Sequence, residues 1–72
     1  MKDLNELTKH TDIYLQEVLF EFYKIKNFVR VTAIDPVSGI EAKIIGPINH
    51  DNEALKKLAI CKLKYVISKT KL

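Results

Sequence analysis

The chain has 72 residues, of which 47% are hydrophobic and 29% are charged, and its formal net charge is +3. This length allows one small domain, and the hydrophobic content excludes a disordered chain. Apolar burial and conformational entropy nearly cancel in so short a chain, so small domains usually need an additional source of stability. Cys61 is the only cysteine, which excludes an intrachain disulfide. We therefore expect self-association, with a homodimer as the default.

The N-terminal residues predict a compartment and a domain boundary. Residues 1–12 mix charges with scattered leucines, and they lack the basic and apolar regions of a signal peptide. No stretch reaches the roughly 20 apolar residues that span a bilayer. A single unpaired thiol fits a reducing compartment. We expect a soluble, cytoplasmic protein that makes no membrane contact, with an N-terminal extension over residues 1–16 and one domain over residues 17–72.

Four segments predict secondary structure in chain order. Asp3, followed three residues later by Glu6, resembles a capping box and predicts a short helix that reaches about His10. Strands are predicted over residues 17–25, 28–35 and 40–45, because these segments are rich in β-branched and aromatic residues. Lys26-Asn27 is a two-residue turn, since Asn tolerates positive φ.

The second turn signal is stronger. In the run DPVSG at residues 35–39, Pro presets φ, Asp can accept a bond from the following backbone, and Gly tolerates the left-handed region. Gly46-Pro47 is expected to end the third strand. The segments thus predict an antiparallel meander.

The first turn fixes the cross-strand register. It predicts the pairs Ile25 with Phe28, Tyr23 with Arg30, Phe22 with Val31, and Phe20 with Ala33. Alternation then places one apolar set on a core face: Val18, Phe20, Phe22, Val29, Val31, Ala33, Ile40, Ala42 and Ile44. The other face mixes apolar and charged residues: Leu19, Glu21, Tyr23, Ile25, Phe28, Arg30, Thr32, Ile34, Glu41, Lys43 and Ile45.

Residues 51–70 have the periodicity of an amphipathic helix. Its core stripe is Leu55, Leu58, Ala59, Leu63, Val66 and Ile67. Ile60, Cys61 and Tyr65 widen the apolar arc, which indicates either a second partner or packing on loop residues. The predicted fold class is α+β: a three-stranded antiparallel meander with the C-terminal helix packed on one face.

Five runs carry a resemblance to known proteins. They are EVLFEF at 17–22, FVRVTAIDP at 28–36, SGIE at 38–41, IGP at 45–47 and LAICKLKYV at 58–66. In these runs, residues 17 to about 67 resemble a family of short alphaproteobacterial proteins of unknown function. The resemblance implies a compact, stand-alone cytoplasmic domain, and it implies no activity, cofactor or site. The extension over residues 1–16 is longer than the leader of that family.

Basic residues concentrate in the predicted helix. The last 17 residues contain six lysines and no acidic residue, whereas the first 55 residues carry six basic and nine acidic side chains. Lys57, Lys64 and Lys71 recur at seven-residue spacing and share one helix face. Two interpretations follow: a solvated face that complements the helix dipole, or a stripe that contacts the phosphates of a nucleic acid.

No group of residues has the spacing of a catalytic or metal site. His10 and His50 lack partners at ligand spacing, and Asp51 beside His50 is better explained as a helix cap. Cys61 on a helix flank is more typical of packing than of a nucleophile, although nearby lysines favour its thiolate. Gly39 and Gly46 are isolated, so no phosphate loop is present. We expect no enzyme, no metal and no cofactor.

Two hypotheses for function remain. The first is a non-enzymatic interaction or assembly module, which binds a second copy or a larger protein. Its candidate surface is Tyr23, Ile25, Phe28, Arg30, Ile34, Ile45 and Tyr65. The alternative structural explanation is that the N-terminal segment covers this face with Leu4, Leu7 and Ile13.

The second hypothesis is RNA or DNA binding. The lysine stripe would contact phosphates, or the aromatic rings of Tyr23 and Phe28, with Arg30, would stack on bases. Tyr23 opposite Arg30 is more simply explained as a cross-strand cation–π pair. The element order is similar to that of the double-stranded RNA-binding domain, but Asp51 and Glu53 stand where that domain has lysines.

Overall fold

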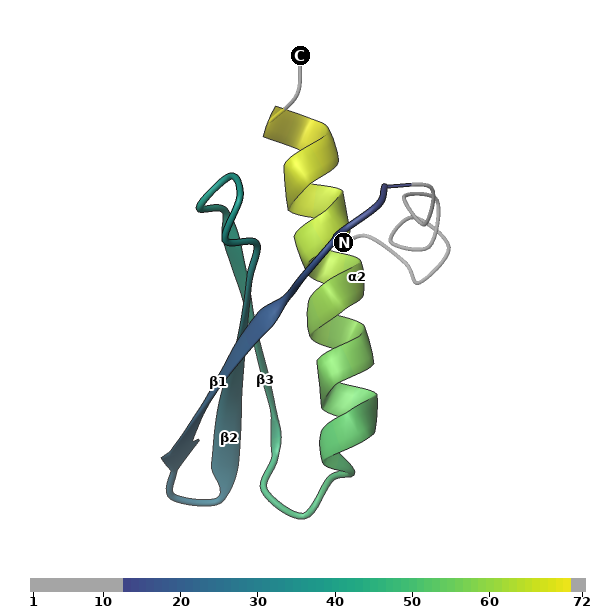
Figure 1. Cartoon of the computed structure of the whole chain (residues 1–72). Helices are drawn as coiled ribbons and strands as arrows, with labels where there is room; N and C mark the ends of the chain where they lie inside the picture. Colours follow the sequence, from purple (N-terminus) through teal and green to yellow (C-terminus); the bar gives the residue numbers. More distant parts are fainter. Residues whose placement is uncertain (1–12, 71–72) are drawn as a thin grey trace.

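The computed structural model describes residues 13–70, in which three strands precede one long helix. The strands are β1 (Leu19–Ile25), β2 (Phe28–Ile34) and β3 (Glu41–Pro47), and the helix is α2 (Asn52–Thr70). The strands form an antiparallel sheet in the order β1-β2-β3, and α2 lies on one side of it (Figure 1). The predicted meander and helix, and with them the α+β class, are confirmed. The predicted short helix that reaches His10 lies outside the described residues.

The register of the first hairpin is also confirmed. Ile25 pairs with Phe28, Tyr23 with Arg30, Phe22 with Val31, and Phe20 with Ala33. The prediction about the turn itself was wrong in one respect. Lys26, and not Asn27, has the positive φ, at 53°. The chain therefore places a side chain with a Cβ in the left-handed region, where that atom crowds the backbone.

The second turn has the predicted chemistry. The Asp35 carboxylate accepts hydrogen bonds from the Val37 amide at 3.2 Å and from the Ser38 hydroxyl at 2.7 Å. Gly39 has a φ of 78°, and its amide donates to the Asp35 carbonyl at 2.8 Å. Asp35 is buried although it lies in a turn. The turn is therefore held by its own side chains, which fixes where β3 begins.

Four strand boundaries differ from the prediction: β2 ends at Ile34 and β3 begins at Glu41, each one residue from the predicted position, and two others differ by two residues. β1 begins at Leu19 and not at residue 17, and β3 continues through Gly46 and Pro47, which were expected to end it. β3 is an edge strand, and proline is tolerated there when its nitrogen faces away from the sheet. Gly46 and Pro47 can therefore extend β3, because no neighbouring strand of the sheet requires a hydrogen bond from the nitrogen of Pro47.

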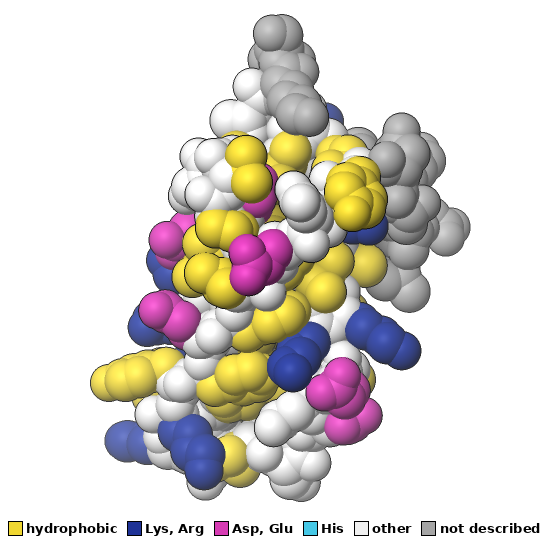
Figure 2. Space-filling model, viewed as in Figure 1, with side chains coloured by type: hydrophobic (Ala, Val, Ile, Leu, Met, Phe, Trp, Pro, Cys, Tyr) yellow, Lys and Arg dark blue, Asp and Glu magenta, His cyan; other side chains and the backbone are white. Residues whose placement is uncertain are grey.

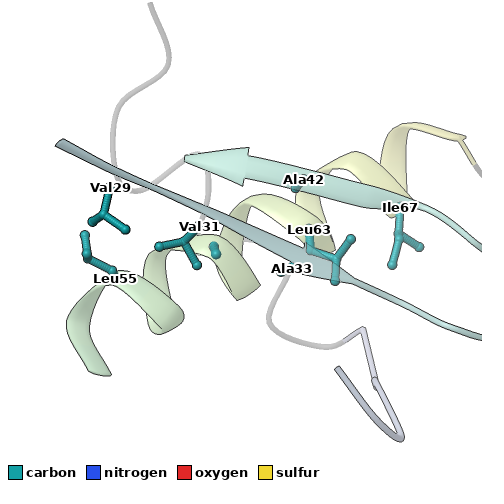
Figure 3. Packing of buried hydrophobic residues seen from close by; sticks show 8 residues of the cluster. Val29, Val31, Ala33, Ala42, Leu55, Leu63 and Ile67 are labelled. Atoms are coloured by element: carbon teal, nitrogen blue, oxygen red, sulfur yellow. The ribbon is translucent and has the colours of Figure 1, made fainter. Parts of the chain in front are cut away.

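The core lies between α2 and the strands (Figure 3). Its buried residues are Val29, Val31, Ala33, Ala42, Leu55, Ala59, Leu63 and Ile67. Alternate residues of the strands and an i, i+4 stripe of the helix supply this set, as expected. The prediction that Phe22 and Leu58 belong to the core was wrong, because each side chain is 41% exposed. The reason is the position of α2, which packs on β2 and β3 and leaves β1 at the margin.

The helix begins at a cap. Asp51 Oδ1 accepts a hydrogen bond from the Glu53 amide at 3.3 Å, and the Asp51 carbonyl accepts one from Leu55 at 3.1 Å. Such a cap satisfies amides that have no partner inside the helix. The predicted capping role of Asp51 is confirmed.

Candidate interaction surface

The sheet face turned away from α2, called the open face below, is arranged in rows across the three strands. Directly opposite residues of an antiparallel sheet share a face, so the register assigns each row. From the first turn toward the second, the rows are Ile25-Phe28-Pro47, Tyr23-Arg30-Ile45, Glu21-Thr32-Lys43 and Leu19-Ile34-Glu41. The predicted mixed face is therefore formed as a continuous surface.

The two rows nearest the first turn are mostly apolar and exposed. Ile45 is 65% exposed, Tyr23 is 59% exposed and Phe28 is 53% exposed. Isolated exposed apolar residues are ordinary on a protein surface, but contiguous ones edged by charge mark contact sites. These rows are contiguous, with charged side chains beside them.

Arg30 occupies the middle of this apolar area. Its guanidinium carbon lies 5.1 Å from the centre of the Tyr23 ring, which confirms the predicted cross-strand cation–π pair. The Arg30 Nε atom is buried and donates no hydrogen bond to any residue in the described range. The cation therefore leans from the central strand toward β1.

The remaining rows are more polar. Thr32 is buried at the centre of the face, with Glu21 and Lys43 on either side of it. Lys43 Nζ and Glu41 Oε1 are 3.5 Å apart, and both side chains are exposed, so this ion pair adds little stability. The open face thus has an apolar end and a charged end.

Six of the seven predicted surface residues lie on this face: Tyr23, Ile25, Phe28, Arg30, Ile34 and Ile45. Ile34 is half-buried. Tyr65 is separate, because it belongs to α2 on the other side of the sheet. Lys69 Nζ lies 5.4 Å from the centre of the Tyr65 ring.

The lysines of α2 divide into two groups. Lys57 is exposed and Lys64 is half-buried, seven positions apart on one side of the helix, while Lys71 lies outside the described residues. Lys56 and Lys62 are held by the fold. Lys56 Nζ is 5.4 Å from the centre of the Phe20 ring, and Lys62 Nζ donates to the Lys43 carbonyl at 2.7 Å. The structure therefore places only two of the three lysines of the predicted stripe, Lys57 and Lys64.

The segment before β1 packs on the core side of the sheet. Ile13 and Leu15 contact the buried cluster. With the β2–β3 turn and the end of α2, this segment lines an open cavity of about 520 Å³. The idea that Ile13 helps to cover the open face is therefore wrong, and Leu4 and Leu7 lie outside the described residues.

The residues that the sequence offered as metal ligands or catalytic groups do not form a common site in the described part of the chain. No group of three or more His, Cys, Asp or Glu side chains could hold a metal within residues 13–70. His50 is exposed, and its amide donates to the Pro47 carbonyl at 3.0 Å. Cys61 is half-buried on the helix. In the same range, no helix is long and apolar enough to cross a bilayer.

Comparison with protein families identifies a family for this chain. Residues 15–70 match the domain of unknown function DUF6898. The chain belongs to this family. Neither the curated proteins nor the solved structures contain a match to the chain. The DUF6898 match includes all four elements described above, so the open face belongs to the family domain.

Sequence reasoning missed one feature of this DUF6898 domain, which is the exposure of β1. Phe20 is half-buried, and the other six residues of β1 are exposed, on both faces of the sheet. The signal was present in the run LFEFYKI, where apolar residues occur at both alternating positions. Such a run is typical of a strand covered on both faces.

Proposed function

We propose that this chain is a non-enzymatic protein-interaction module that self-associates, with the open face as its protein-binding surface. The observation that supports this most directly is the exposure of Tyr23, Phe28 and Ile45 in adjoining rows. Antiparallel sheets with one covered face usually present polar residues to water on the other. An apolar, solvated face is what a partner would bury.

The size of the core supports self-association. Among residues 13–70, three of the eight buried core residues are alanines, Ala33, Ala42 and Ala59, and an alanine buries little apolar area. Cys61 is the only cysteine of the chain, so no disulfide within the chain adds stability. A second copy would supply the missing apolar burial.

The proposal also concerns the cellular compartment and the binding partner. We expect the module to act in the cytoplasm, in keeping with an unpaired thiol at Cys61, and to bind a second copy or a larger protein. We also propose that the family to which this chain belongs occurs in alphaproteobacteria, as the resemblance of the sequence indicates.

Sedimentation velocity over a concentration series tests the proposal. The wild-type chain should sediment faster as its concentration rises. Phe28→Glu should weaken association through the open face by about tenfold or more, because burying an unpaired carboxylate is costly. Val37→Glu is the matched control, since Val37 is 81% exposed in the β2–β3 turn, away from the open face. A wild-type chain that stays monomeric throughout the series would exclude the proposed self-association.

A second candidate is nucleic-acid binding. It is favoured by the stack of Arg30 on Tyr23 beside the exposed Phe28 ring, which resembles a base-stacking platform. We rank it second because the open face also carries Glu21 and Glu41, whose charge opposes phosphate. The test is given in the Discussion.

A further inference from the structure

Within residues 13–70, no strand pairs with the outer edge of β1, which has apolar side chains on both of its faces. Leu19 and Ile25 are exposed on the open face, and Phe22 is exposed on the face that carries α2. Because α2 lies over β2 and β3, the second face of β1 is left at the margin (Figure 1). Figure 2 shows hydrophobic side chains in a band on the side of the molecule where β1 lies.

The backbone groups of β1 that face outward follow from the hydrogen bonds at both ends of β2. Asn27 O accepts from Ile48 N at 2.9 Å, and Asp35 N donates to Ile40 O at 2.9 Å. Residues with odd numbers along β2 therefore bond toward β3, and those with even numbers bond toward β1, because the direction alternates. In the observed register, the residues of β1 whose amides and carbonyls point away from the sheet are Phe20, Phe22 and Lys24.

The other edge of the sheet is partly blocked for such pairing. The same alternation turns Glu41, Lys43, Ile45 and Pro47 outward on β3. The Lys43 carbonyl already accepts the hydrogen bond from Lys62 Nζ, and Pro47 has no amide hydrogen to donate. Proline and lysine are the residues with which proteins protect sheet edges. β1 contains no proline, and Lys24 is the one lysine among its outward-facing residues.

We propose that β1 pairs antiparallel with β1 of a second copy, about a two-fold axis at Phe22, to form a six-stranded sheet. This inference rests on the self-association proposed above and adds to the open face a second contact, at the edge of β1. Centring on Phe22 overlaps all seven residues of β1. Phe22 then pairs with Phe22 of the second copy, and Phe20 with Lys24, so all three outward-facing residues bond. An axis at any other residue leaves part of the strand unpaired.

The side chains agree with this register on both faces. On the helix side, the two Phe22 rings meet at the axis, and each Lys24 lies opposite a Phe20 ring. On the open face, Leu19 lies opposite Ile25 of the second copy. The two strands thus bring apolar side chains together, and neither charged residue of β1 lies opposite a like charge.

The charges are complementary across the seam. Glu21 of one copy lies opposite Tyr23 of the other, in the row that continues to its Arg30. The Arg30 guanidinium leans over the Tyr23 ring, toward that seam. A carboxylate therefore approaches a half-buried cation whose Nε atom donates no hydrogen bond within residues 13–70. Arg30, which neither the core nor the turns use, has a role in this dimer.

The expected dimer is weak. Seven paired residues extend about 23 Å, at about 3.3 Å per residue. A contact of one strand with the flanking side chains lies at the small end of protein interfaces, where complexes are transient. We expect dimer and monomer to exchange, and covalent trapping is the appropriate test.

Disulfide trapping in a Cys61→Ser background tests the edge and the register. In Phe22→Cys, the two Cα atoms across the axis are about 5.5 Å apart, within the range for a disulfide. In the control Lys24→Cys, on the same face of the same strand, the two residues are offset by four positions, or about 13 Å. Mild oxidation should trap Phe22→Cys as a dimer at least about tenfold faster than Lys24→Cys.

A second pair of variants keeps Phe22 in place. Phe20→Cys mixed with Lys24→Cys should form the mixed disulfide faster than either forms its own. If Phe22→Cys is no faster than Lys24→Cys, and the mixture gives no preferred mixed disulfide, the pairing of β1 is overturned. A wild-type chain that still associates in sedimentation would then leave the proposed function standing.

The open face is tested independently of the edge. Phe28 lies on β2, one strand away from the seam. Phe28→Glu should therefore leave the Phe22→Cys disulfide rate within about twofold, although it weakens association through the open face. Loss of the disulfide in this variant would show that the open face forms the contact, and would overturn the edge model.

Discussion

Leu55 packs directly on the backbone of Gly46. A Cβ atom built on Gly46 would lie 2.6 Å from Leu55 Cδ2, a separation that real Cβ atoms do not show. Leu55 is one of the most buried side chains of the core, so it has little room to move. The first turn of α2 can approach β3 only because residue 46 has no side chain.

Gly46→Ala should therefore destabilise the fold. We expect the free energy of unfolding to fall by about 1–3 kcal/mol, as in other overpacked cores. Urea denaturation followed by circular dichroism measures the change. In a Leu55→Ala background the same substitution should cost much less, because the clashing methyl is gone. Equal costs in the two backgrounds would show that Leu55 is not the obstacle.

Lys26→Gly should stabilise the protein. Lys26 has a φ of 53°, a region that costs a residue with a Cβ about 1 kcal/mol and costs glycine almost nothing. We expect a rise of roughly that size in the free energy of unfolding. Asn27→Gly is the control, and it should give no gain, since Asn27 is not among the residues with positive φ. The prediction fails if the two glycine variants are equally stable.

Ser38→Ala should weaken the second turn. The Ser38 hydroxyl donates to the Asp35 carboxylate at 2.7 Å and accepts from the Ile40 amide at 3.2 Å. Losing both bonds should lower the free energy of unfolding by about 1–2 kcal/mol. Ser68→Ala is the comparison, because Ser68 only donates to a carbonyl of its own helix and alanine favours helix. A smaller loss for Ser38→Ala than for Ser68→Ala would contradict this account.

Charge reversal on α2 tests the nucleic-acid alternative. If the chain binds RNA or DNA through the lysine stripe, binding should weaken as salt rises, and replacing Lys57, Lys64 and Lys71 by Glu should abolish it. Fluorescence anisotropy with a labelled mixed-sequence oligonucleotide measures both effects. Glu21→Gln is a useful partner variant, because it should strengthen binding only if the open face contacts phosphate. The absence of salt-sensitive binding by the wild-type chain would exclude this function.

Local sequence patterns were sufficient to predict most of the fold. Alternation in residues 19–34 and a two-residue turn gave the register, and the chemistry of Asp35 and Gly39 gave the second turn. They were sufficient because each of these features depends on residues close together in the chain. The helix stripe was predicted for the same reason.

The failures concern the position of one element relative to another. Phe22 and Leu58 have the right periodicity for the core, but periodicity does not tell how far a helix lies across a sheet. Gly46 was interpreted as the end of a strand, whereas its role is set by Leu55, which follows nine residues later in the chain. The six open-face candidates were found by alternation, while Tyr65 was assigned without a way to place it relative to them.

The hydrogen bond from Lys62 to the Lys43 carbonyl limits how far the sheet can grow. A chain with two available edges can add copies without end, as a fibre does. A chain that pairs more readily through one edge favours a single added copy, because both outer edges of the resulting sheet are then the partly blocked β3 edges. Lys62 on the helix and Pro47 on the strand would thus favour a finite complex of two chains over continued strand pairing into filaments.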